Sequence, residues 1–384
     1  MASTSFSRIF LDGAVLETGA ISMPQGHRQQ AQAIMHVVDG TLDFSSQLNR
    51  LLSAYGQVLE GPLKGYKSVF LRIFLSDALS QMPLLAPHLS LFSPSEVSVI
   101  QQPPLDGTSI ALWMMLSSDV DLRRLPNGLL ECSHGMYRDY YSSASAPSGC
   151  SSHDATCSLL ESYAATLKEM RGTLKDHCMR TWFFVHDIDD NYQGVVKGRN
   201  EVFDQEDLTT GTHFLSSTGI GGTSAREGAI VQMDAYAMMG MESSQVSFLY
   251  ALDHLNRTSE YGVRFERGTR IDFGDRRLAI ISGTASIDAG GEIVHPGDVT
   301  AQTLRMWENV LALLEEAECG FEDVLSMIVY LRNPSDYPVV RDLFKERFPE
   351  MPVILLWAPV CRPGWLIEME CMALKAQDKP FNAF

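Results

Sequence analysis

The sequence predicts an α+β fold in which mixed sheets carry helices packed on one face, duplicated within the chain. Two observations lead to this prediction. Residues 274–374 alternate short apolar strands with two amphipathic helices, in the order β, β, α, β, α, β, β. The middle of the chain repeats the pattern, with 181–185 in the place of 327–331 and 231–238 in that of 367–374. Such self-similarity indicates similar units that pack against one another.

The first half of the C-terminal unit is an apolar strand followed by a long helix. The strand covers 278–283, and a turn-rich loop ends at Asp298, which can cap the helix that follows. Apolar residues recur along that helix at spacings of three and four, as expected of a buried helical face. They are Leu304, Trp307, Leu311 and Leu314.

The second half of the unit alternates strand and helix again. A strand rich in β-formers spans 324–331, and Asn333-Pro334 ends it and opens a helix that continues to about Phe348. Residues 352–357 and 365–374 give the last two strands.

Three segments are expected, because 384 residues are too many for one compact core. We predict a degenerate αβ segment at 1–120, a degenerate copy of the unit at 121–245, and a complete unit at 260–376. In the first segment only half a unit is visible, because residues 70–75 weakly resemble the strand at 327–331.

Composition restricts the classes of partner. The net charge of −17 disfavours nucleic-acid binding, since an acidic surface repels phosphate groups. No apolar run reaches 18 residues and the N-terminus has no signal-peptide pattern, so neither a membrane span nor export is predicted. The seven cysteines form no CxxC pair, which favours buried thiols in a reducing, cytoplasmic compartment. We predict no metal and no cofactor.

One carboxylate is a candidate for acid–base chemistry. Glu368 lies in the apolar strand 365–369, where alternation places it on one face together with Glu370. Burial there would raise its pKa and keep it protonated. The matching residue of the middle unit is Gln232, which cannot serve as an acid. The alternative is that Glu368 faces solvent or pairs with an arginine.

The last hundred residues resemble the Rid/YjgF family, also described as endoribonuclease L-PSP-like. The resemblance is carried by ISG at 281–283, by Gln302 and Asn309, by the strand–helix segment 324–348 and by IEMECMA at 367–373. It implies a Rid-like (chorismate-mutase-like) sheet and, commonly, a homotrimer. Family members that hydrolyse enamines and imines use an arginine at a position held here by Cys361. Arg362 is adjacent but is expected to point away.

Residues 110–375 are similar to the chorismatases, which cleave chorismate to pyruvate and a ring acid. Five short pieces occur in the family's order: Tyr192 with Gly198-Arg199, then STGIG at 217–221, then YG and FER at 261–267, then ISGTASI with HPGDVTxQ at 281–302, and finally LIEME at 366–370. The resemblance implies a small anionic substrate and one active site in the last unit.

The implied site contains an acid, a thiol and groups that bind carboxylates. Glu368 would protonate the enolpyruvyl carbon, and Cys361 with Gly283 resembles the subtype that forms 3-hydroxybenzoate. Guanidinium groups suit the two carboxylates, and the backbone of 218–222 could present N–H groups to one of them. The substrate-binding residues implied are Tyr192, Arg199, Thr218, Gly219, Tyr261, Arg267 and Gly283.

Each assignment has a plainer alternative: surface salt bridges for the arginines, a flexible turn for 218–222, a passive buried thiol for Cys361. Two rival functions also remain open. One is a Rid-type enamine/imine deaminase that uses Glu368 and water. The other is a non-catalytic protein that binds small carboxylates.

Overall fold

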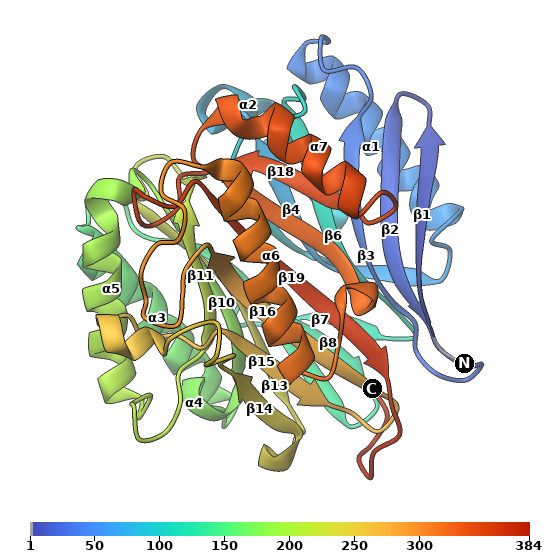
Figure 1. Cartoon of the computed structure of the whole chain (residues 1–384). Coiled ribbons are helices and arrows are strands. Elements are labelled where there is room, and N and C mark those ends of the chain that lie inside the picture. The colour runs from blue at the N-terminus through green and yellow to red at the C-terminus, as the bar shows by residue number, and fades with distance from the viewer. Residues whose placement is uncertain (1–2) are drawn as a thin grey trace.

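The computed structural model describes residues 3–384, apart from the side chains of Ser3 and Tyr261. Three sheets follow one another along the chain, and helices cover their outer faces (Figure 1). No helix of the described chain is long and apolar enough to cross a membrane.

The N-terminal sheet has seven strands and is covered by α1 (Phe44–Glu60) and α2 (Ala78–Leu85). Its order across the sheet is β1 (Ser3–Leu11), β2 (Ala14–Ser22), β3 (Gln30–Val37), β6 (Ile110–Ser118), β4 (Tyr66–Leu75), β5 (Glu96–Gln101) and β12 (Thr223–Ser224). The short strand β12 is supplied by the middle of the chain, so the first two units share a sheet.

The middle sheet has six strands and is covered by α3 (Ser152–Glu169) and α5 (Ile188–Gln205), with the short α4 (Leu174–His177) between them in the chain. Its strands, in spatial order, are β11 (Ser216–Gly221), β10 (Cys178–Val185), β13 (Val231–Met239), β9 (Tyr137–Ser145), β8 (Leu130–His134) and β7 (Asp121–Arg124).

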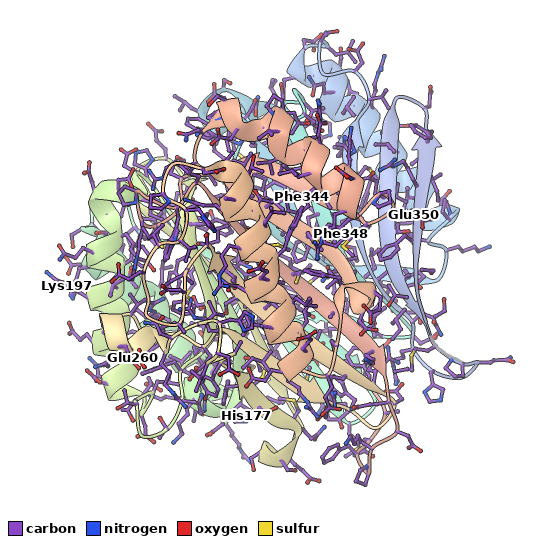
Figure 2. The ribbon with its side chains drawn as sticks, in the orientation of Figure 1. His177, Lys197, Glu260, Phe344, Phe348 and Glu350 are labelled. Atoms are coloured by element: carbon purple, nitrogen blue, oxygen red, sulfur yellow. The ribbon has the colours of Figure 1, made fainter. Side chains whose placement is uncertain are left out.

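The C-terminal sheet has six strands and is covered by α6 (Val299–Glu316) and α7 (Tyr337–Arg347). Its strands, in spatial order, are β14 (Val246–Leu249), β15 (Gly268–Asp272), β16 (Arg276–Ala285), β19 (Ile367–Ala376), β17 (Val324–Leu331) and β18 (Val353–Trp357). Phe344 and Phe348 of the α7 region (Figure 2) hold the two helices together, with ring centres 5.0 and 5.5 Å from that of Trp307.

All three sheets have the same topology, which confirms the predicted α+β fold and its repetition. In each, the last strand lies between the third and the fourth strands of the unit. The register repeats as well, since the end of the fourth strand always pairs with the start of the last one. These pairs are Leu75 with Ile110, Val185 with Val231, and Leu331 with Ile367.

The first unit holds more than the half unit seen in the sequence. Its strands β1 to β3 were missed because Ser3–Leu11 begins with polar residues and lacks the motifs of the last unit. The third sheet also includes β14, which precedes the expected start at residue 260.

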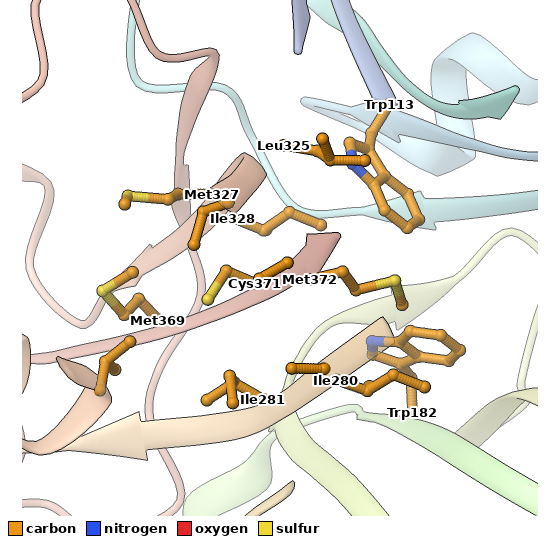
Figure 3. Close-up of a cluster of buried hydrophobic side chains, with 14 of the residues drawn as sticks. Trp113, Trp182, Ile280, Ile281, Leu325, Met327, Ile328, Met369, Cys371 and Met372 are labelled. Atoms are coloured by element: carbon orange, nitrogen blue, oxygen red, sulfur yellow. The ribbon is translucent and has the colours of Figure 1, made fainter. Parts of the chain in front are cut away.

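The inner faces of the sheets meet in one shared core. Figure 3 shows Trp113 of the first unit and Trp182 of the second beside Ile280, Met372 and other residues of the third. Separate apolar clusters lie under α1 and under α3 and α5. Because the three units share a core, residues from different units can face a common cavity.

Candidate active site

A narrow cavity of about 30 Å³ lies between the middle and the C-terminal units. Its walls come from α5 and β11 on one side and from β16, β19 and the loops before β15 and β19 on the other. Eight of the nine site residues named from the sequence line it: Tyr192, Arg199, Thr218, Gly219, Arg267, Gly283, Cys361 and Glu368. The ninth is Tyr261, whose side chain lies outside the described residues.

Glu368 is the buried acid of the cavity. Glu368 lies on β19, where it pairs with Ala285 and with Tyr330, and it is only 4% exposed. Burial and the charge of Glu370 raise the pKa of the Glu368 carboxyl to about 8, although Arg180 and Arg267 act in the opposite direction. The carboxyl group is therefore mainly neutral at pH 7, so that it can donate a proton.

Gly283 makes the space that the carboxyl group occupies. The pairing of β16 with β19 shifts by one residue between Ile281 and Thr284, as in a β-bulge. The Gly283 N–H in this bulge donates a hydrogen bond to Thr218 Oγ1 at 2.9 Å. A Cβ atom on Gly283 would lie 2.1 Å from Glu368 Oε1, so any side chain there would displace the acid.

Arg199 brings a buried positive charge to the opposite wall. It follows Tyr192 by two helical turns on α5 and is 1% exposed. Its Nε and Nη2 atoms make no hydrogen bond to any described residue. A buried, unsatisfied guanidinium is costly, so these atoms are suited to a carboxylate of a ligand.

Two more arginines line the cavity. Arg267 donates to the backbone and side-chain oxygens of Asn256 at 3.2 Å, and its guanidinium lies 5.4 Å from the ring centre of Phe265. The expectation that Arg362 points away is wrong: it lines the cavity, with its guanidinium 4.7 Å from the Trp365 ring centre. The loop between β18 and β19 turns at Pro363-Gly364 and does not run as an extended strand, so simple alternation fails there.

Cys361 contributes a neutral thiol. Burial raises its pKa to about 12, although a hydrogen bond with Tyr192 acts in the opposite direction. The thiol is therefore protonated at neutral pH and is a weak nucleophile. In this state it can contact a ligand as a small polarisable group or donate a weak hydrogen bond.

Residues 218–222 do not form the predicted anion-binding loop. They continue β11, and the N–H groups of Gly221 and Gly222 bond to the carbonyl oxygens of Pro359 and Val185 at 2.9 and 3.1 Å. Gly219 has a different role, since a Cβ atom there would lie 2.9 Å from the ring of Tyr192. The glycine lets that ring pack against the strand.

A buried polar network behind the cavity was missed from the sequence. Glu370 forms a salt bridge with Arg180 and accepts hydrogen bonds from Trp182 Nε1 at 2.9 Å, from Thr218 Oγ1 at 2.5 Å and from Tyr330 at 3.1 Å. These residues come from both units. Alternation pointed to Glu370, but nothing in the sequence linked it to Arg180.

The first unit reaches this network through one buried arginine. Arg72 of β4 pairs with Asp234 of β13 at 2.8 Å and lies 3.8 Å from Glu370. All three residues are almost fully buried. The charge next to Glu368 is thus fixed by groups from all three units.

A family model described as endoribonuclease L-PSP matches residues 270–375. A RutC family protein of Pyrococcus abyssi is 38% identical over 98 residues, which are 25% of this chain and 76% of that protein. The chain belongs to the Rid/YjgF superfamily. The predicted family resemblance is therefore confirmed for the C-terminal unit.

Longer matches extend beyond that unit. A 3-hydroxybenzoate synthase of Streptomyces hygroscopicus is 29% identical over 218 residues, and the match spans 50% of this chain and 62% of that protein. A crystal structure of a chorismatase superimposes with a TM-score of 0.62 at 21% identity, covering 81% of this chain and 94% of that one. This Rid/YjgF protein therefore has a chorismatase-like fold.

Proposed function

We propose that the chain cleaves the enolpyruvyl ether of chorismate to pyruvate and a ring acid. The observation that carries this proposal is a buried, neutral Glu368 in the same cavity as the unsatisfied guanidinium of Arg199. Cleavage of a vinyl ether requires a strong proton donor to carbon, and a dianionic substrate requires buried cations.

The arginines are proposed to bind the two carboxylates. Arg199 would take one of them with its free Nε and Nη2 atoms, in the two-pronged geometry of guanidinium and carboxylate. Arg267 and Arg362 would bind the other, since both line the same cavity. The apolar rings of Phe265 and Trp365 lie beside these guanidinium groups and would contact the substrate ring.

The chemistry begins when Glu368 gives its proton to the terminal methylene carbon of the enolpyruvyl group. The carbon–carbon π electrons form the new C–H bond, which leaves an oxocarbenium ion next to the carboxylate that Glu368 has become. If water attacks this cation, a hemiketal forms and its ether C–O bond breaks to release pyruvate and a dihydroxy acid. If the neighbouring ring hydroxyl attacks, a cyclic ketal forms and the hydroxyl proton leaves. The ring C–O bond of that hydroxyl then breaks as the ring loses a C–H proton and becomes aromatic, and cleavage of the ether C–O bond releases pyruvate. The Glu368 carboxylate stabilises the cation and recovers a proton at the end.

The ring product is proposed to be 3-hydroxybenzoate. Pyruvate and 3-hydroxybenzoate together contain all the atoms of chorismate, so this outcome needs no added water. The protonated thiol of Cys361 lies in the cavity wall with Glu368, where it would exclude a water molecule from the ring. The 29% identity to a 3-hydroxybenzoate synthase supports this choice.

Incubation of the purified protein with chorismate tests the proposal. Pyruvate would be measured by a coupled lactate dehydrogenase assay and the ring acid by chromatography against authentic 3-hydroxybenzoate. Release of both in equal amounts is expected. Folded protein that releases no pyruvate above the spontaneous background would end the proposal.

A second candidate is the hydrolysis of enamines or imines that carry a carboxylate. One observation favours it, because Arg362 lines the cavity and could bind that carboxylate. Water would then attack the imine carbon and release ammonia, with Glu368 as the acid. Ammonia released from an enamine acid generated in the assay, together with no activity on chorismate, would favour this function.

A further inference from the structure

A cluster of three metal-ligating side chains lies outside the cavity, where α3 and α5 pack together. His153 and Cys157 are one turn apart on α3, so they share a face, and Glu201 faces them from α5. Among the described residues, one donor atom from each lies within 4.8 Å of the other two. We propose that these three residues bind a divalent transition metal of the zinc class.

The distances between the donor atoms support this site. His153 Nε2 is 3.0 Å from Glu201 Oε2 and 3.8 Å from Cys157 Sγ. Around a tetrahedral zinc, with bonds of about 2.0–2.3 Å, neighbouring donors would be about 3.3–3.5 Å apart. Shifts of a few tenths of an ångström in the two contacts would therefore admit the ion.

The site also has the outer contacts that zinc sites need. Asp154 Oδ1 lies 3.0 Å from His153 Nδ1, so a carboxylate holds the imidazole with its other nitrogen directed at the cluster. Gly198 of α5 lets the two helices lie close, since a Cβ atom there would be 2.6 Å from the His153 carbonyl oxygen and 3.2 Å from Cys157 Sγ.

The charges and the donor types both favour zinc. Asp154, Glu161 and Glu201 place negative charge around the thiol, and this charge attracts a cation. One thiol, one imidazole and one carboxylate suit zinc, whereas magnesium and calcium prefer sites made of oxygen alone. The three side chains leave a fourth position for water.

Zinc binds a thiolate and a neutral imidazole, so binding must displace protons from the ligands and the affinity is expected to fall as the pH falls.

The proposal replaces the expectation of no metal, which rested on the spacing of residues along the chain. His153 and Cys157 alone are two ligands, and Glu201 lies 44 residues beyond Cys157. Only the packing of α5 on α3 completes the set. The same helix carries Arg199 toward the cavity, so a bound metal would fix α5 from its outer side.

The test is a titration of the metal-free, reduced full-length protein with zinc alone, in competition with a chromophoric chelator. One ion per chain is expected, bound at micromolar or lower concentration. Cobalt should give a thiolate-to-metal charge-transfer band. C157S should remove that band, and C157S and H153Q should each weaken zinc binding at least about tenfold, the scale seen for loss of an outer-shell partner alone.

Matched controls locate the site. C150S removes a cysteine from the loop before α3 that is not part of the cluster, and it should bind zinc within twofold of the wild type. Zinc should raise the melting temperature of the wild type and of C150S but not of H153Q. The proposal would be overturned if the wild type bound no zinc, or if H153Q and C157S bound zinc as tightly as the wild type. A loss of binding confined to C150S would overturn it as well.

Discussion

Two equivalent positions of the fold have opposite environments. Glu368 and Gln232 are each the second residue of the last strand in their unit. Gln232 is satisfied by its neighbours, since it donates to Ser98 at 3.0 Å and accepts from Ser224 at 2.9 Å. Among the described residues, none donates a hydrogen bond to the Glu368 carboxyl, which faces a cavity. The interface between the first and middle units, at Gln232, is thus closed. The interface between the middle and C-terminal units, at Glu368, is available for a ligand.

The fold alone therefore does not make the site. The same strand register supplies both positions, and the difference lies in a few side chains. Serines fill the space around Gln232, whereas Gly283 leaves space beside Glu368 and Arg199 faces that space. Substitutions at these positions test which differences matter.

The largest effect is expected from Glu368→Gln. Loss of the proton donor should lower kcat for pyruvate release by about 10²–10⁴-fold, the usual contribution of general acid catalysis. The amide has nearly the same shape, so circular dichroism should be unchanged. Activity within tenfold of the wild type would remove Glu368 from its proposed role.

Arg199→Gln should follow. Loss of a charged hydrogen bond of about 1.5–3 kcal/mol would lower kcat/KM for chorismate by about 10–100-fold, mainly through KM. Arg341→Gln on α7, whose guanidinium bonds to the exposed Asp342, is the matched control and should have wild-type kinetics. Equal effects of the two substitutions would argue against a carboxylate at Arg199.

The pH profile should report the acid. Because the pKa of Glu368 is raised to about 8, kcat/KM should be constant near pH 7 and fall about tenfold per unit well above pH 8. Glu370→Gln removes a neighbouring negative charge, which should stabilise the Glu368 carboxylate and move this limb to lower pH by about one unit. If a folded Glu370→Gln variant lost kcat/KM at the same pH as the wild type, the coupling of the two residues would be contradicted.

Cys361→Ala should change the product more than the rate. We expect pyruvate release to stay within about threefold, since a protonated thiol does not take part in the proton transfer. The ring product should shift from 3-hydroxybenzoate toward the dihydroxy acid formed by hydrolysis. An unchanged product ratio, measured by chromatography, would leave Cys361 without a role in product choice.

The smallest effect on activity is expected from Gln232→Glu. It places a carboxyl at the equivalent position but within the serine network, with Asp234 nearby on the same strand. The amide donor to Ser98 is lost, so unfolding free energy should fall by about 1–3 kcal/mol. Activity below the melting temperature should be unchanged, and a clear change would show that the two interfaces are coupled.

Much of the site could be predicted because the decisive residues lie in short, ordered motifs. Glu368 was found from its apolar strand, and Tyr192 and Arg199 from helical spacing and the family resemblance. Arg180, Arg72 and the inward turn of Arg362 were missed, because they depend on how the three sheets pack. The complete first unit was missed for a similar reason, since its strands lack distinctive motifs and only the shared core shows their role.

Stability gives a substrate-free check of the same carboxyl group. The pKa of Glu368 is raised from 4.5 to about 8 in the fold, so between these values the folded state binds more protons than the unfolded state. The wild type should therefore lose stability relative to Glu368→Gln as the pH rises through this window, by at most roughly 1.4 kcal/mol per pH unit. If the free energies of unfolding of the two proteins changed equally with pH, the Glu368 carboxyl would lie in water.

Infrared difference spectroscopy tests the neutral state of Glu368 most directly. The spectrum of the wild type minus that of Glu368→Gln at pH 7 should contain the carbonyl stretch of a protonated carboxylic acid, and this band should disappear above about pH 8 as the carboxylate forms. A carboxylate band at pH 7 with no protonated carbonyl stretch would contradict the proposed proton donor.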